Sequence, residues 1–304
     1  MHQLKRLVYG SAFWLLAACS DPLTLEDIDQ KYMNSASLRM RLMGMNVHYR
    51  DEGSGPAVVM IHGTGSSLHT WDAWVAEMAG SFRFIRVDLP GCGLTGPRSD
   101  RAYEIQDDVA FMKAFLSRLN LRHAHWVGSS LGGRIAWDYA LQYPEQVKTL
   151  TLIDALGYPQ AEWPPAIQLA QYPVIDTIMA NFLPRAVFKA SLRDLYHKNF
   201  FISNELVDRY YELALREGNL QAFTDRVKAT LDQDSSRMPE IKRPTLIMWG
   251  EEDRYFPVAS AHRFHKDIEG SALVVFPGVG HLPMEEAPLA SANAFLDFVR
   301  SGSQ

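Results

Sequence analysis

Short runs of apolar residues alternate with longer segments of helical periodicity along most of this chain. An uninterrupted apolar run such as 57–61 is typical of a strand buried on both faces, because an exposed face would bring in alternating polar residues. Strands that alternate with helices form a mostly parallel sheet covered by helices on both sides. The pattern therefore predicts an α/β fold with an eight-stranded sheet. The expected strands are 38–42, 45–49, 57–61, 84–87, 124–128, 147–153, 244–249 and 272–276, and the expected helices are 70–79, 104–119, 131–143, 258–267 and 289–300.

Residues 156–235 interrupt this alternation. They hold helical segments separated by prolines and no run typical of a buried strand. We therefore expect a helical insertion between two strands of the sheet. The flanking segments 37–155 and 236–304 would then form one core.

The first nineteen residues differ from the rest of the chain. Lys5 and Arg6 precede an apolar stretch, 7–18, that is too short to span a bilayer. The Leu-Ala-Ala-Cys run that ends at Cys19 resembles the bacterial lipobox, in which the cysteine is lipidated after cleavage. We expect a lipoprotein signal peptide at 1–18, membrane anchoring through lipidated Cys19, and a polar tether at 19–36. An ordinary signal peptide is the alternative.

This reading of the first residues has consequences for the rest of the protein. It predicts a bacterial cell-envelope location, at the outer membrane or the periplasmic face rather than in the cytoplasm. Cleavage before Cys19 would leave Cys92 as the one remaining free thiol, so we expect no intramolecular disulfide.

Charge and motif content exclude several classes of partner. The chain has 30 Lys and Arg against 35 Asp and Glu, a net charge of −5, and no basic cluster. A nucleic-acid partner is therefore not expected. The sequence has neither H-E-x-x-H nor paired C-x-x-C spacing, and no G-x-G-x-x-G follows a predicted strand. We accordingly predict no metal and no cofactor.

One motif carries most of the chemistry. Gly128-Ser129-Ser130-Leu131-Gly132 matches G-x-S-x-G, directly after a predicted strand and before a predicted helix. Such a sharp turn would hold Ser130 in a strained conformation with its hydroxyl exposed. The two glycines would let the strand and helix backbones approach closely. The motif therefore predicts that Ser130 is a nucleophile.

Together with this motif, four further segments give the chain a family resemblance. The chain resembles the α/β-hydrolase fold family, in its cap-bearing serine esterase-like branch, over residues 37–302. The resemblance implies that 156–235 is a helical cap above the site, and its Trp163, Tyr172, Phe182 and Phe188 favour an apolar pocket. The supporting segments are 62–65, 88–93, 250–257 and 280–281.

A nucleophilic serine needs a base and an orienting acid. His281 follows the predicted strand 272–276, and Asp253 follows the strand that ends at 249, so both would lie at the same sheet edge. The order Ser130, Asp253, His281 also matches the order of the fold. Asp154, at the end of strand 147–153, is the alternative acid. His62 is the alternative base, although the resemblance implies a structural role for it.

Two backbone N–H groups should form the oxyanion hole. One belongs to Leu131, directly after the nucleophile, and the other to Thr64 in the loop after 57–61. Gly63 and Gly65 would let this loop, supported by His62, fold back toward the substrate.

These residues predict a serine hydrolase that cleaves carboxylic ester bonds through an acyl-enzyme, acting on small to medium apolar acyl esters or lipids. A carbon–carbon bond hydrolase of the meta-cleavage type, or a lactonase, is the alternative with the same triad. Leu282 follows His281 where meta-cleavage enzymes often have Trp, which favours the esterase. Dehalogenases and epoxide hydrolases of this fold use an Asp nucleophile, which Ser130 disfavours. A non-catalytic binding protein of this fold usually lacks a triad member.

Overall fold

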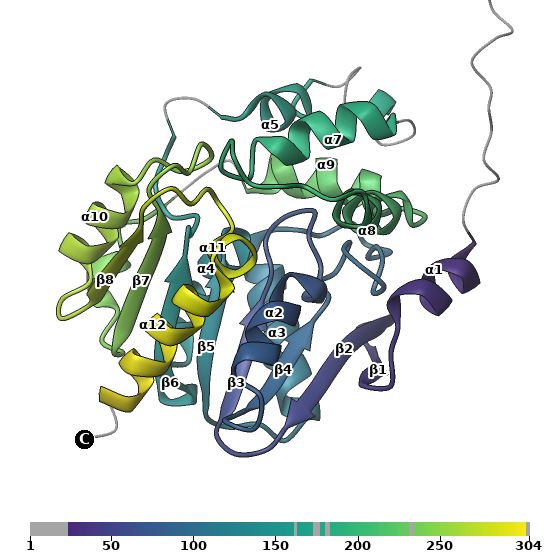
Figure 1. Cartoon of the computed structure of the whole chain (residues 1–304). Coiled ribbons are helices and arrows are strands. Elements are labelled where there is room, and N and C mark those ends of the chain that lie inside the picture. Colours follow the sequence, from purple (N-terminus) through teal and green to yellow (C-terminus); the bar gives the residue numbers. More distant parts are fainter. Residues whose placement is uncertain (1–23, 161–162, 173–176, 180–182, 231–233, 302–304) are drawn as a thin grey trace, which may run out of the picture.

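The computed structural model describes residues 24–160, 163–172, 177–179, 183–230 and 234–301. An eight-stranded sheet with the order β1-β2-β4-β3-β5-β6-β7-β8 runs through its centre (Figure 1). The predicted α/β fold with a mostly parallel eight-stranded sheet is confirmed, and the segments 37–155 and 236–304 supply its strands. The strands are β1 (Ser37–Leu42), β2 (Met45–Gly53), β3 (Ala57–Ile61), β4 (Arg83–Val87), β5 (Ala124–Ser129), β6 (Val147–Ile153), β7 (Thr245–Gly250) and β8 (Ala272–Phe276).

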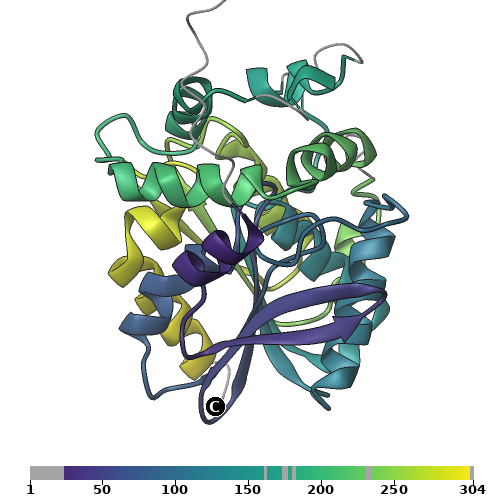
Figure 2. The same ribbon diagram turned by 90° about the vertical axis from the view of Figure 1, so that its right-hand side faces the viewer.

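The sheet is antiparallel at one edge only. β2 pairs antiparallel with both β1 and β4, and every pair from β4 to β8 is parallel. Met43 and Gly44 turn the β1–β2 hairpin with φ values of 48° and 79°. Two successive residues of positive φ are what a two-residue hairpin turn requires. Figure 1 shows this hairpin at one edge of the sheet, and in Figure 2 it lies across the front of the molecule.

Side chains of each central strand alternate between two apolar layers. In β3, Val59 and Ile61 face one layer, whereas Val58 and Met60 face the other. The fully buried run 57–61 is therefore explained by helices on both faces of the sheet. The first layer contains α3 (Ile105–Arg118), α4 (Leu131–Gln142) and α10 (Ala259–Asp267), and the second contains α2 (Asp72–Glu77), α11 (Pro283–Glu286) and α12 (Pro288–Ser301).

The predicted elements match the observed ones to within a few residues. The helix expected at 70–79 is split into a 3-10 turn at Leu68–Trp71 followed by the shorter α2, and the short helix α11 was not predicted. Trp71 and Trp74 are fully buried, as expected for core residues.

The insertion 156–235 contains helices and no strand in its described residues. Figures 1 and 2 show these helices gathered over one end of the sheet. The chain enters the insertion from the carboxyl end of β6, so it lies on the side where the loops after the parallel strands converge. Its helices are α5 (Pro165–Leu169), α7 (Arg185–Arg193), α8 (Asn204–Leu215) and α9 (Asn219–Ala229).

The predicted polar tether at 19–36 is wrong for its described part. Helix α1 (Leu25–Tyr32) begins there with a capping box, in which the side chains of Thr24 and Asp27 each accept a hydrogen bond from the other's backbone N–H. Ile28 is buried against Leu94 and Leu213. The polar residues of this segment suggest a tether in the sequence, but in the structure they form the solvent side of an amphipathic helix. The expected signal peptide 1–18 and Cys19 lie outside the described residues, and within them no helix is long and apolar enough to cross a membrane.

Helix α1 is tied to the insertion by charged contacts. Lys31 Nζ lies 2.7 Å from a carboxylate oxygen of Glu212 on α8, and the hydroxyl of Tyr32 donates to the same carboxylate at 2.6 Å. A single helix at the N-terminal end therefore connects the sheet edge to the helical insertion above the sheet.

Candidate active site

Ser130 lies at the sharp turn between β5 and α4. Its φ of 55° and ψ of −118° place it in a conformation that residues with a side chain rarely adopt. The backbone around it is held from a neighbouring strand, because Ser130 N–H donates to Ile153 O at 2.9 Å and Leu156 N–H donates to Ser130 O at 3.0 Å. The fold thus sustains the strain that the motif predicted.

The two glycines of the motif are required by close backbone contacts. A Cβ on Gly128 would lie 2.2 Å from the carbonyl oxygen of Gly132, and a Cβ on Gly132 would lie 2.1 Å from that of Ile61. Real Cβ atoms do not come this close to backbone, so a side chain at either position would push α4 off the sheet.

His281 lies on the loop after β8. Its ring stacks on Tyr255 with 5.1 Å between centroids and meets Phe256 edge-on at 5.3 Å. Its backbone N–H donates to Leu195 O in the insertion at 2.7 Å. The imidazole is therefore fixed from both the sheet side and the cap side.

Asp253 contacts the imidazole directly. His281 Nδ1 lies 2.8 Å from Asp253 Oδ2, while Asp253 Oδ1 accepts hydrogen bonds from the N–H groups of Tyr255 at 2.7 Å and Phe256 at 3.2 Å. Three donors thus surround the Asp253 carboxylate, which can hold Nδ1–H on the ring and leave Nε2 free to accept a proton.

Asp154, the alternative acid, is fully buried at the end of β6 with a φ of 43°. Its Oδ1 accepts a hydrogen bond from Gly250 N–H at 2.9 Å. The imidazole of His281 bonds to Asp253 instead. Asp154 nevertheless lies close to this pair. One carboxylate oxygen of Asp154, one of Asp253 and one ring nitrogen of His281 lie within 4.8 Å of one another.

The loop after β3 runs beside the serine. Gly63 packs against Ser130, and Thr64 and Gly65 line the same cavity as Leu131. Below this loop, His62 is fully buried, with Nδ1 2.7 Å from Gly63 O and Nε2 accepting from Leu89 N–H at 3.0 Å. Burial lowers the pKa of His62. Because both ring nitrogens are engaged, His62 supports the loop and is not available as a base.

Ser130 and His281 open onto one cavity of about 330 Å³ beneath the insertion. Most of its lining is apolar, with Trp163, Phe188 and Phe223 contributed by the insertion. Tyr172 is exposed and does not contribute to the lining, and Phe182 lies outside the described residues. The polar side chains on the cavity wall include Ser66, Thr70 and Tyr210.

Sequence reasoning missed a buried carboxylate that joins the cap to the core. Glu285 accepts hydrogen bonds from Thr70 Oγ1 at 2.6 Å and from the hydroxyls of Tyr196 and Tyr210, both at 2.7 Å. Its neighbour Glu286 accepts from the backbone N–H groups of Gly280 at 2.9 Å and His197 at 2.7 Å, which fixes the loop of the candidate base. Two acidic residues so close after His281 were the available signal.

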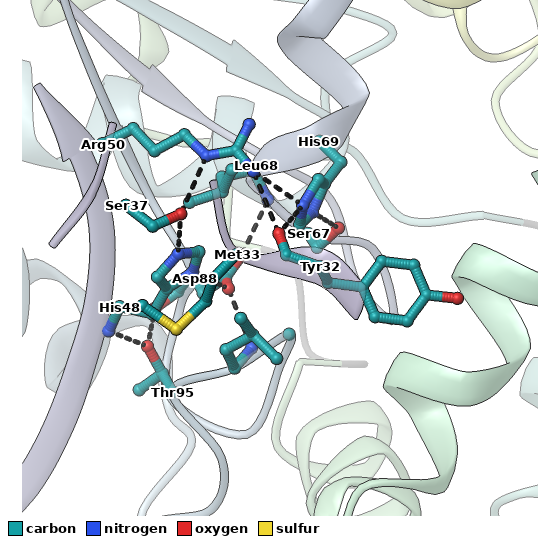
Figure 3. Close-up of polar contacts among 12 residues, drawn as sticks. Tyr32, Met33, Ser37, His48, Arg50, Ser67, Leu68, His69, Asp88 and Thr95 are labelled. Atoms are coloured by element: carbon teal, nitrogen blue, oxygen red, sulfur yellow. Dashed lines mark hydrogen bonds and ion pairs between the residues drawn. The ribbon is translucent and has the colours of Figure 1, made fainter. Parts of the chain in front are cut away.

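A second Ser–His–Asp grouping lies away from the cavity, where Ser37 and His48 of the β1–β2 hairpin meet Asp88 of the loop after β4 (Figure 3). Ser37 Oγ is 3.0 Å from His48 Nε2, and His48 Nδ1 is 2.7 Å from Asp88 Oδ2. Asp88 also accepts from the backbone N–H groups of Leu68 at 2.7 Å and Leu94 at 2.8 Å. Asp88 therefore supports the loops around Leu68 and Leu94 through backbone hydrogen bonds.

Comparisons with known proteins agree with this architecture. A family model for the alpha/beta hydrolase fold matches residues 56–288. The chain belongs to the alpha/beta hydrolase fold family. A member from Burkholderia vietnamiensis, a 2-hydroxy-6-oxononadienedioate/2-hydroxy-6-oxononatrienedioate hydrolase, is 30% identical over 294 residues, which cover 90% of this chain and 97% of the relative.

Solved structures of the family include two different kinds of hydrolase. The "putative lipase (lip1)" of Acinetobacter baumannii superimposes with a TM-score of 0.78 at 25% identity, covering 94% of this chain and 99% of the other. A meta-cleavage product hydrolase from Pseudomonas fluorescens superimposes with a TM-score of 0.76 at 23% identity, covering 87% and 97%. The protein is thus an alpha/beta hydrolase, and the similar proteins carry names that include a putative lipase and a meta-cleavage product hydrolase.

Proposed function

We propose that this hydrolase cleaves carboxylic esters with apolar acyl groups, in the manner of a carboxylesterase or lipase. The observation that carries the proposal is the convergence of a strained Ser130 and an Asp253-bound His281 on one largely apolar cavity. A reactive hydroxyl, a base held in one tautomer and a pocket that can receive an apolar acyl group suit acyl transfer.

In the proposed mechanism, Ser130 Oγ attacks the ester carbonyl while His281 Nε2 takes its proton. The negative oxygen is held by the N–H groups of Thr64 and Leu131, and Asp253 stabilises the imidazolium. His281 then protonates the departing alcohol, which leaves an acyl group on Ser130. Water, deprotonated by His281, attacks this acyl-enzyme and releases the acid and the free serine.

The apolar cavity supports the choice of an acyl ester as the substrate. Each methylene buried there is worth about 0.8 kcal/mol, so kcat/KM should rise with acyl length until the cavity is filled. We therefore expect medium-length esters to be hydrolysed faster than acetate.

Carbon–carbon bond hydrolysis of the meta-cleavage type is the second candidate, because relatives that align along most of the chain are named as hydrolases of such compounds. Lactone opening would use the same groups. A meta-cleavage substrate is a dienoate with a charged carboxylate, which needs a cationic or polar partner in the pocket. No Lys or Arg among the described residues lines the cavity, and Arg209, next to the lining residue Tyr210, is paired with Glu285 at 3.2 Å. This pairing favours the ester over the dienoate.

The test is hydrolysis of p-nitrophenyl esters from acetate to palmitate by the full chain and by its Ser130→Ala variant, with Ser37→Ala as the matched serine control. The proposal predicts turnover with a medium-chain optimum that is lost in Ser130→Ala and kept in Ser37→Ala. Turnover of a 2-hydroxy-6-oxo-dienoate without ester turnover would instead establish the second candidate. Ester turnover that survives Ser130→Ala would overturn both.

We also propose that the protein is a lipoprotein of the bacterial cell envelope, anchored through Cys19. This proposal rests on the residue pattern of the first nineteen positions alone. Growth of the producing bacterium with labelled palmitate should label the protein. The labelled protein should be found in the membrane fraction. A Cys19→Ser variant should lose both the label and the membrane association, and an unlabelled wild-type protein would overturn the proposal.

A further inference from the structure

A second buried carboxyl group lies beside the candidate acid. Asp154 is fully buried at the end of β6, in a left-handed conformation that fixes the direction of its side chain. One oxygen of Asp154, one oxygen of Asp253 and one ring nitrogen of His281 lie within 4.8 Å of one another. The mechanism above uses Asp253 and His281 but gives Asp154 no role.

Hydrogen-bond donors are divided unequally between the two carboxyl groups. Asp253 accepts from His281 Nδ1, Tyr255 N–H and Phe256 N–H. Asp154 Oδ1 accepts from Gly250 N–H alone, and Asp154 Oδ2 meets no donor among the described residues. An ionised carboxylate with an oxygen left unpaired inside a protein is costly.

Two neighbouring carboxyl groups in a buried site cannot both be ionised cheaply. The ionised member should be the one with three donors, which is Asp253. Burial, and next the negative charge of Asp253, raise the pKa of Asp154 well above its usual range, and Glu286 adds to this effect. Asp253 and Glu286 therefore both oppose the ionisation of Asp154, whereas His281 is a neighbour that adds nothing to this effect, and we expect the proton to stay on Asp154.

We propose that Asp154 is a positioning residue that carries a proton on Oδ2 and donates it in a hydrogen bond to Asp253. The inference rests on the proposed function, because Asp154 acts through Asp253 and touches no substrate. The bond gives Asp253 a fourth donor, which fixes the carboxylate against the imidazole. A neutral Asp154 also adds no further negative charge beside His281, which would otherwise stabilise the imidazolium more and hold its proton more tightly.

Two substitutions of Asp154 distinguish a protonated side chain that donates a hydrogen bond from an ionised side chain that carries a charge. In Asp154→Asn, the amide oxygen can accept from Gly250 N–H and the amide nitrogen can donate to Asp253, so the proposed pattern is kept. We expect its kcat/KM within about threefold of wild type and an unchanged midpoint for the acid limb of the pH profile. Asp154→Ala removes the donor, and we expect kcat to fall about 10- to 100-fold at an unchanged KM, as for loss of a hydrogen bond to a charged group.

The opposite charge state predicts a different result. If Asp154 were ionised, Asp154→Asn would remove a negative charge from beside the imidazole. The acid limb would then move by about one pH unit or more to lower pH, and Asp154→Asn would lose as much kcat as Asp154→Ala. Either result would overturn the proposal.

A spectroscopic measurement tests the proton without relying on turnover. The infrared difference between the wild-type protein and Asp154→Asn at neutral pH should contain the carbonyl stretch of a protonated carboxylic acid, which shifts in D₂O. Absence of this band would overturn the inference. If the band is present but the wild type hydrolyses no ester, the proposed function fails and the protonation of Asp154 stands.

Discussion

The described part of the chain contains two Ser–His–Asp groupings that share an imidazole–carboxylate hydrogen bond but differ in their surroundings. Ser130 and His281 line the cavity at the carboxyl end of the sheet, and Asp253 bonds to His281, whereas Ser37 and His48 lie on the edge hairpin and Asp88 follows β4. In both, the imidazole Nδ1 lies within hydrogen-bond distance of a buried carboxylate, at 2.8 Å and 2.7 Å.

The surroundings of the two hydroxyl groups separate the two groupings. Ser37 Oγ is contacted by His48 and by Arg50 Nε at 3.3 Å (Figure 3). It also accepts from Asn34 N–H at 3.1 Å and does not line the cavity. Ser130 sits at a strained turn before a helix and faces a pocket large enough for a substrate. The comparison shows that a hydroxyl, an imidazole and a carboxylate joined by hydrogen bonds can have a purely structural role. A catalytic site also needs a strained turn, oxyanion donors and space for a substrate.

The largest effect should come from removing the imidazole at the cavity. We expect His281→Ala to lower kcat for ester hydrolysis by about 10,000-fold or more, because Ser130 then lacks a base. The exposed His123→Ala is the matched control and should keep wild-type activity. Steady-state kinetics on a medium-chain p-nitrophenyl ester measures both, and full activity in His281→Ala would remove the distinction between the two groupings.

Replacing Asp88 by Asn should mainly lower stability, whereas replacing Asp253 by Asn should mainly lower activity. Burial would raise the pKa of Asp88, but the adjacent rings of His48, His62 and His69 hold it well below its usual range, so the folded state contains an ionised Asp88. We expect Asp88→Asn to lower the free energy of unfolding by about 3–5 kcal/mol, as for breaking a buried pair.

Asp253→Asn is the counterpart at the cavity. It should lower kcat by about 10,000-fold, as loss of the orienting acid does in such triads. Urea unfolding and ester kinetics on both variants make the test. An Asp88→Asn protein that is fully stable and inactive would contradict the assignment.

His69 lies beside the grouping of Ser37, His48 and Asp88. Its titration should make the free energy of unfolding depend on pH. Burial lowers the pKa of His69 to about 4, and its Nε2 lies 3.0 Å from an Arg50 guanidinium nitrogen. The unfolded chain takes up this proton near its ordinary pKa of about 6.5, so stability should fall as pH drops from about 6.5 to 4.

His69→Gln removes this titration and keeps polar side-chain atoms at the site. We expect it to reduce the slope of unfolding free energy against pH by up to about 1.4 kcal/mol per pH unit in that window. The measurement is urea unfolding at several pH values. An unchanged slope would show that His69 does not titrate in the folded protein as described.

The smallest effect should come from Ser37→Ala. Its hydroxyl makes ordinary hydrogen bonds in a half-buried position, so we expect a loss of about 0.5–1.5 kcal/mol in stability and activity within about twofold of wild type. Thermal unfolding and ester kinetics test this, and a large loss of activity would mean that Ser37 takes part in the reaction.

The sequence was sufficient to predict the core of the fold because its signals are local. Apolar runs such as 57–61 identify buried strands, and the G-x-S-x-G motif fixes where Ser130 lies relative to a strand and a helix. Once the strand order is assumed, the loops after β7 and β8 bring Asp253 and His281 to the same edge.

The features that could not be predicted depend on contacts between distant segments. The sequence of helix α1 resembles a tether because Ile28 packs against residues far along the chain. These residues are Leu94 and Leu213. The pairing of His48 with Asp88 joins residues 40 positions apart. The cap surface of the cavity depends on how helices pack, which periodicity alone does not determine.

The most direct test of the account is covalent labelling of the full chain with a fluorophosphonate, followed by peptide mapping. Serine Oγ displaces fluoride from phosphorus only where a base and an oxyanion site assist it. The account predicts a single adduct on Ser130, lost in Ser130→Ala, with no adduct on Ser37 in either protein. Labelling at Ser37, or no labelling of a folded wild-type protein, would contradict the assignment of Ser130 as the nucleophile.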